Sequence, residues 1–165
     1  MSQDNTLKIR PSILDRLIDN EPKNTVETEK DRYQIITELR ESVRRDLEKL
    51  FNSRVRCLTA EERHQEAETS LINYGLPDLA TVNLMNMDER LLFFREMAKI
   101  IECYEPRFKS VEITHIDNTN ELDRTVRFKV DAVLHADPAP EVIIFDSMME
   151  PISRNVNVET SHYDG

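Results

Sequence analysis

The chain has 165 residues, 39% of them hydrophobic and 33% charged, with a formal net charge of −10. This length fits one domain with tails, and the acidic balance argues against nucleic acid as a main partner, because phosphate binding needs a basic face. No long apolar run occurs, so we expect a cytoplasmic protein that does not insert into a membrane.

The first half of the sequence predicts helices. Residues 1–11 are polar and are expected to form a flexible tail, and Ser12 can cap a short helix after Pro11. Apolar residues of this short helix recur at helical spacing: Ile13, Leu14, Leu17 and Ile18. Residues 31–54 predict a long helix, because apolar side chains recur there every three or four positions: Ile35, Ile36, Leu39, Val43, Leu47, Leu50 and Phe51.

The middle of the sequence predicts a loop and a second long helix. Residues 70–79 are expected to form an ordered loop packed on the core, in which Gly75 can adopt a left-handed conformation and Pro77 interrupts any helix. The second long helix is predicted from Asp88, as its cap, to about Tyr104. The dense apolar face of this helix indicates burial on more than one side.

The last third of the sequence predicts strands, because the apolar period changes to two. Residues 111–115 and 126–134 form a predicted hairpin, and the apolar run 142–145 predicts a third strand buried on both faces. The fold class is therefore α+β: two long helices and a short N-terminal helix packed on a small, mainly antiparallel, three-stranded sheet. An exposed edge of such a sheet can accept a strand from another chain.

Signals for catalysis are weak. Only two glycines occur, Gly75 and Gly165, which excludes glycine-rich phosphate and dinucleotide loops. A carboxylate pair for glycoside hydrolysis is available by number alone, since 32 acidic residues always permit one. No metal or nucleophile spacing includes the histidines His64, His115, His135 and His162. We therefore predict no enzyme activity, cofactor or metal, and we interpret the two cysteines as reduced packing thiols: Cys57 and Cys103.

The segment Cys103–Phe108, CYEPRF, lies between the second predicted helix and the first predicted strand. Pro106 lacks an N–H and disfavours the α region at Glu105, so the helix is expected to end near Tyr104. In the extended run that follows, residues two apart point to the same side, which places Glu105 beside Arg107. Two interpretations stay open: the pair locks the helix end to the strand, with Arg107 reaching helix-end carbonyls, or it contacts another chain.

Four segments in this order resemble one protein family: ESVRRDLEKLFNSR (41–54), SLINYGLPDL (70–79), EPRF (105–108) and RFKVDAVLHADPAPEVIIFD (127–146). Residues 12–151 as a whole resemble the phage baseplate wedge proteins that carry the label lysozyme-like, and above all their type VI secretion relative, the baseplate subunit TssE. Ala80-Thr81 depart from the usual Ser-Gly, and Tyr104 replaces a common Phe. Residues 152–165 match no part of the family and are interpreted as a polar tail.

The resemblance implies a non-enzymatic structural subunit of a contractile injection machine. Such a subunit joins other baseplate wedge subunits in a hetero-oligomeric complex with a sixfold arrangement, and it templates the first ring of the contractile sheath. The family's EPR motif maps onto Glu105, Pro106 and Arg107, which are therefore the expected partner-binding residues. Two other functions stay open: a cell-wall glycoside hydrolase, suggested by the older family label, and a wedge protein of a phage-like tail.

Overall fold

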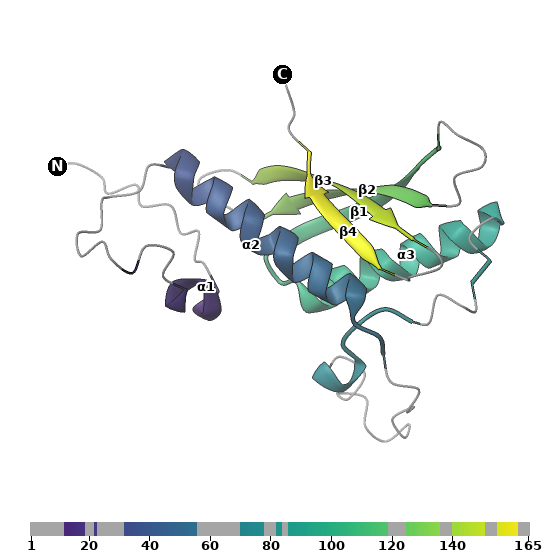
Figure 1. The fold of residues 1–165 in the computed structure, drawn as a ribbon, viewed down its shortest axis with the longest axis horizontal. Helices are drawn as coiled ribbons and strands as arrows, with labels where there is room; N and C mark the ends of the chain where they lie inside the picture. Colours follow the sequence, from purple (N-terminus) through teal and green to yellow (C-terminus); the bar gives the residue numbers. More distant parts are fainter. Residues whose placement is uncertain are drawn as a thin grey trace.

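The computed structural model describes residues 12–18, 22, 32–55, 70–77, 82–83, 86–118, 125–135, 140–150 and 155–161. The expected flexible tail, residues 1–11, lies outside them, and the domain boundaries stay predictions. Within these ranges the chain folds into an α+β structure (Figure 1). Its elements are α1 (Ile13–Leu17), α2 (Arg32–Asn52), the 3-10 turn η2 (Leu71–Asn73), α3 (Met87–Tyr104), β1 (Phe108–Ile116), β2 (Val126–Leu134), β3 (Glu141–Met149) and β4 (Val156–Thr160).

The predicted helices are confirmed, with corrections to one cap and to the packing of the short helix: α1 is bonded to α2 through Asp15 and leaves its apolar side chains exposed, not buried against the sheet. Ser12 caps α1 in a capping box, since its hydroxyl accepts a hydrogen bond from the Asp15 N–H while the Asp15 carboxylate accepts one from Ser12 N–H. The cap of α3 is Asn86 and not the predicted Asp88: its side-chain oxygen accepts hydrogen bonds from two main-chain N–H groups of the first turn. Asp88 lies in that turn instead, where its negative charge suits the positive end of the helix.

The sheet has four antiparallel strands in the order β1-β2-β3-β4, so the predicted three-stranded sheet is wrong. The extra strand, β4, comes from the segment interpreted as a polar tail. It has only five residues and buries two valine side chains, too short an alternation to stand out in a polar segment. The run predicted to be buried on both faces also alternates: in β3, Ile143 and Phe145 are buried, whereas Val142 is 61% exposed.

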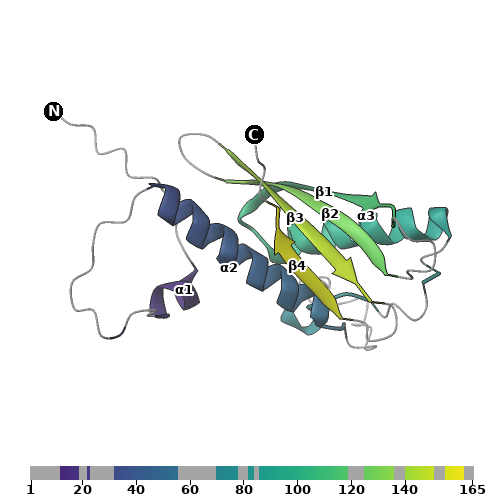
Figure 2. The same cartoon turned by 45° about the horizontal axis from the view of Figure 1, so that its top comes forward.

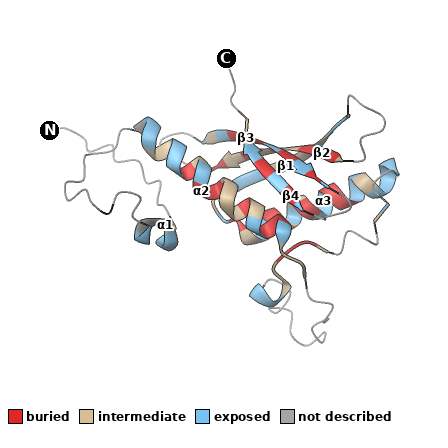
Figure 3. Ribbon diagram, in the orientation of Figure 1, coloured by how far each residue is buried: buried red, intermediate tan, exposed pale blue. Residues whose placement is uncertain are grey.

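The core lies between the sheet and two long helices. Figures 1 and 2 show α2 and α3 on the same face of the sheet, α2 beside β4 and α3 beside β1. The Phe128 ring of β2 lies 5.9 Å from the Phe51 ring of α2 and 5.6 Å from the Phe94 ring of α3, which joins the three elements. Figure 3 shows the buried positions gathered where the helices meet the sheet.

Cys103, predicted as a packing thiol, is exposed on α3, and Cys57 lies outside the described residues.

The loop after α2 returns to the end of that helix at Gly75. Gly75 has the predicted positive φ, +123°, and a Cβ there would lie 2.7 Å from the carbonyl carbon of Ser53. The next residue, Leu76, is fully buried and donates its N–H to the Ser53 carbonyl at 2.9 Å. The expected packing of this loop therefore holds for Leu76, whereas Leu71 and Ile72 are exposed.

Candidate functional site

The CYEPRF segment forms the joint between α3 and β1. The helix ends at Tyr104 as predicted, and the Glu105 N–H still donates to the Ile101 carbonyl at 2.8 Å. Pro106 is exposed in a turn that closes when Phe108 N–H donates to the Glu105 carbonyl at 3.1 Å. The strand that follows starts immediately, so the joint fixes the direction of β1 relative to α3.

Glu105 and Arg107 bond to each other within the chain. Arg107 Nε donates to Glu105 Oε1 at 2.5 Å, and Arg107 Nη2 donates to Glu105 Oε2, so the contact is bidentate. The main-chain N–H of Arg107 also donates to Glu105 Oε1, at 3.2 Å. The Glu105 side chain is only 7% exposed and that of Arg107 is 21% exposed. This geometry confirms that the two side chains share one side and form an internal lock.

Arg107 also reaches α2 and not, as one prediction held, the carbonyls at the end of α3. Its Nη2 donates to Asp46 Oδ2 at 2.6 Å and its Nη1 donates to Ser42 Oγ at 3.1 Å. Burial of the guanidinium acts to lower the pKa of Arg107, but hydrogen bonds and negative charges from Glu105 and Asp46 together raise that pKa. Arg107 is therefore a permanently charged tie between α2 and the α3–β1 joint.

The same contacts continue to α1. Ser42 Oγ donates to Asp15 Oδ2 at 2.5 Å, and Arg45 Nη2 donates to Asp15 Oδ1 at 3.0 Å. Burial raises the pKa of Asp15, but hydrogen bonds from Ser12 and Ser42, with the charge of Arg45, lower it overall. We call the six connected side chains the joint network: Asp15, Ser42, Arg45, Asp46, Glu105 and Arg107.

Sequence reasoning identified two members of this network and missed the four on α1 and α2. Asp46 and Ser42 lie 61 and 65 positions before Arg107, so no local pattern connects them. One signal was available in the sequence, because Ser42 is a polar residue beside the apolar stripe of α2. In the structure this residue is only 3% exposed. A buried serine needs a hydrogen-bond partner, and Arg107 and Asp15 supply them.

The outer edge of β4 is occupied by side chains of α2. Asn52 Nδ2 donates to the Val156 carbonyl and Asn52 Oδ1 accepts from the Val156 N–H, both at 2.9 Å. Arg44 Nη1 donates to the Val158 carbonyl at 3.1 Å and is ion-paired with Glu48, while Arg44 Nη2 is ion-paired with Glu41. A further strand cannot pair with this edge while these contacts hold.

The outer edge of β1 differs from that of β4. Arg107 carbonyl accepts from His135 N–H, and the register pairs Ile116 with Arg127, so alternate residues of β1 pair with β2. The main-chain groups of the intervening residues point outward: Val111, Ile113 and His115. Among the described residues, no side chain hydrogen-bonds these groups. Within the described part of the chain, the outer edge of β1 therefore carries no side-chain hydrogen bond, and α3 covers the inner face of this strand.

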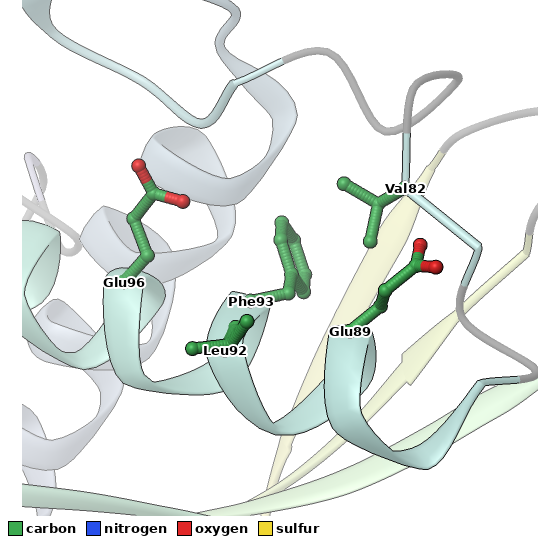
Figure 4. Close-up of a pocket in the computed structure, with 5 residues that line it drawn as sticks. All are labelled: Val82, Glu89, Leu92, Phe93 and Glu96. Carbon is green, nitrogen blue, oxygen red and sulfur yellow. The ribbon is translucent and has the colours of Figure 1, made fainter.

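A shallow hollow of about 190 Å³ lies on α3, lined by Val82, Glu89, Leu92, Phe93 and Glu96. Figure 4 shows the two carboxylates at opposite ends of this hollow with the Phe93 ring between them. Glu89 Oε2 accepts a hydrogen bond from the Asn83 N–H at 2.9 Å, so one carboxylate is already engaged. The hollow is smaller than ligand pockets, which measure roughly 300–1,000 Å³.

The described residues contain no group of three or more His, Cys, Asp or Glu side chains arranged to hold a metal ion. Within the same ranges, no helix combines the length and apolar character needed to cross a bilayer.

Comparison with known proteins identified one family. The model of the family described as "Baseplate wedge protein gp25" matches residues 37–139, a range that runs from α2 past β2 and includes the α3–β1 joint. No curated protein and no solved structure matches the chain.

Proposed function

Because the chain belongs to the family of the baseplate wedge protein gp25, we propose that it is a structural, non-enzymatic subunit of a type VI secretion baseplate. In this role it joins the other wedge subunits of a sixfold, hetero-oligomeric complex in the cytoplasm. It also templates the first ring of the contractile sheath. The observation that carries the second role is the difference between the two edges of the sheet.

Templating requires a place where a sheath strand can add to this chain. β4 is unsuitable because Asn52 and Arg44 occupy main-chain atoms on its outer edge. β1 presents outward main-chain groups at Val111, Ile113 and His115, and α3 holds this strand in place from one face. A sheath strand that pairs with β1 would extend the four-stranded sheet by main-chain hydrogen bonds.

The joint supplies the second contact, with the other wedge subunits. Glu105 is buried and bonded to Arg107, so its role is to fix the guanidinium. Pro106 is exposed, and Arg107 keeps 21% of its side chain accessible, so these two residues can touch a partner. In the EPR motif, Glu105 is thus the positioning residue, and Pro106 and Arg107 are the contact residues.

Two variants at one position test the sheath contact. His115→Pro removes an outward N–H from β1 without removing a bond to β2, and edge strands tolerate such a proline. His115→Ala is the matched control, since both variants lose the ring stacked on Phe94 at 6.3 Å but only the proline lacks the N–H. Co-purification with type VI sheath subunits should survive in the alanine variant and fall several-fold in the proline variant.

The outcomes of this test separate parts of the proposal. Equal binding by folded His115→Pro and His115→Ala would exclude the edge of β1 as the sheath site. The wild-type chain could instead bind the sheath or wedge subunits of a phage-like tail and none of those of a type VI system. This result would assign the protein to a phage-like tail.

The non-enzymatic part of the proposal has its own test. Purified chain incubated with peptidoglycan from acid to neutral pH is expected to release no soluble fragments. Release that disappears in Glu89→Gln or Glu96→Gln would instead identify the hollow on α3 as a hydrolase site.

A further inference from the structure

Helix α1 presents its apolar side to solvent. Ile13 and Leu17 are 79% and 76% exposed, and Leu14 and Ile18 are 56% and 40% exposed. These residues lie at positions i, i+1, i+4 and i+5, so they form one continuous stripe along the helix. Figure 3 shows α1 apart from the buried core. A contiguous exposed apolar stripe on an otherwise charged protein indicates an interaction surface.

The helix is held to the body through a polar contact. In the described part of the chain, the hydrogen bonds from α2 to α1 come from Ser42 and Arg45 and end on the Asp15 carboxylate. A helix of five residues is unstable alone, because too few hydrogen bonds offset the cost of nucleation. Docking of Asp15 on α2 therefore stabilises the helix and turns its apolar stripe away from the core.

Arg107 controls this anchor through Ser42. A hydroxyl has one proton to donate, and because Arg107 Nη1 donates to Ser42 Oγ, the Ser42 proton is directed to Asp15. Ser42 is 3% exposed, so water does not compete freely for these bonds. The EPR motif is thereby connected to the orientation of α1 through two hydrogen bonds.

We propose that the apolar stripe of α1, Ile13, Leu14, Leu17 and Ile18, docks into an apolar groove with a basic rim on a neighbouring baseplate wedge subunit. The spacing suits a helix laid in a groove. The net charge of −10 favours a basic rim and disfavours a second copy of this chain, because two such chains repel each other. Hydrogen bonds through Asp15, Ser42 and Arg107 also connect α1 with the proposed wedge contact at the joint. This inference rests on the proposed wedge function.

The direct test is binding of the purified complex of the other wedge subunits to the full chain, measured as a Kd. The double variant Leu14→Asp/Leu17→Asp should weaken binding at least about 10-fold. The matched control is Leu71→Asp on η2, an 83% exposed leucine outside the stripe, which should change the Kd less than about 2-fold. Binding to sheath subunits serves as the second readout and should be unchanged in both variants.

Three results would overturn the inference. If the double variant binds the wedge complex like wild type while sheath binding is intact, α1 is not the docking helix, although the proposed function stands. If the double variant instead abolishes self-association measured by sedimentation, the stripe binds a second copy. Failure of the wild-type chain to bind wedge or sheath subunits would reject the proposed function itself.

The positioning role of Ser42 has a separate readout. Ser42→Ala should speed amide exchange at Ile18, whose N–H donates to the Leu14 carbonyl, and should weaken wedge binding about 3- to 10-fold with little change in sheath binding. Unchanged exchange at Ile18 would show that the Arg107–Ser42–Asp15 contacts do not hold α1.

Discussion

β1 and β4 are the two edge strands of one sheet, and α2 fastens them in different ways. β4 is bonded along its outer edge by Asn52 and Arg44. The described hydrogen bonds from α2 to β1 lie at the start of that strand, where Arg107 bonds the α3–β1 joint to Ser42 and Asp46. One edge is therefore closed to further strands, whereas the other is held in place with outward main-chain groups unoccupied by described side chains.

This difference shows that side chains of a helix can do the work of an additional strand. Asn52 offers one donor and one acceptor to Val156, the same pair of groups that a neighbouring strand would offer. Because side chains of α2 occupy the outer edge of β4, β1 is the edge strand at which we propose that a partner strand adds. A sheath ring templated by this sheet would consequently grow from one side.

The largest loss of stability is expected where Arg107 bonds the start of β1 to α2. Arg107→Ala leaves the Glu105 carboxylate buried without its counter-charge and should lower the free energy of unfolding by about 3 kcal/mol. Denaturant unfolding measures this change. Glu105→Leu/Arg107→Met removes both charges and should be less destabilised than Arg107→Ala, since no buried charge is left unpaired. A double variant that is less stable than the single one would contradict the internal lock.

A smaller loss is expected at the closed edge. Asn52→Ala leaves the N–H and carbonyl of the buried residue Val156 without partners and should cost about 2 kcal/mol of unfolding free energy. Hydrogen exchange should also accelerate in β4 before the rest of the sheet. Asn157→Ala, an exposed position on the same strand, is the control and should cost less than about 0.5 kcal/mol. Equal costs at the two positions would mean that Asn52 does not close the edge.

Arg44→Ala tests the second contact at the closed edge. It removes the hydrogen bond to the Val158 carbonyl together with partly exposed ion pairs, and should cost about 1 kcal/mol. Arg40→Ala is the comparison, because Arg40 makes one partly exposed ion pair with Glu141 and should cost about 0.5 kcal/mol. Thermal unfolding measures the loss of stability in both variants. A loss in Arg44→Ala no larger than that in Arg40→Ala would contradict a stabilising main-chain bond from Arg44.

Lowering the pH should weaken the bonds between Asp15 and α2 but not those between Asn52 and β4. Of the changes considered, this one should alter the free energy of unfolding least. The pKa of Asp15 is lower in the folded chain than its usual value of 3.8, so its bonds stabilise α1 above that value. This stabilisation is lost as the pH falls through the lowered pKa, below about 3.8. The amide contacts of Asn52 do not titrate. Amide exchange at Ile18 should therefore accelerate in acid before that at Val156, and simultaneous acceleration would contradict this assignment.

Much of the fold could be predicted because it depends on periodicity. The apolar stripe of α2 and the alternation in β2 identified both elements, and the residue types at Ser12 and Gly75 identified a cap and a left-handed turn. The short strand β4 was missed because its pairing with β3 and its bonds to Asn52 are contacts across distant sequence.

The site could be predicted only as far as it depends on local sequence. The proline at position 106 localised the joint, and the extended backbone placed Glu105 beside Arg107. The partners on α2, Ser42 and Asp46, depend on how α2 packs against the α3–β1 joint, which no local pattern specifies. The contact role of Pro106 and Arg107 stays a prediction.

The most direct test of the account is amide hydrogen exchange of the full chain, resolved by residue, with and without sheath subunits. We expect new protection at the outward amides of β1, those of Val111, Ile113 and His115, and no change at Val156 in β4. Protection at β4, or binding of sheath subunits with no protection at β1, would contradict the assignment of β1 as the templating edge.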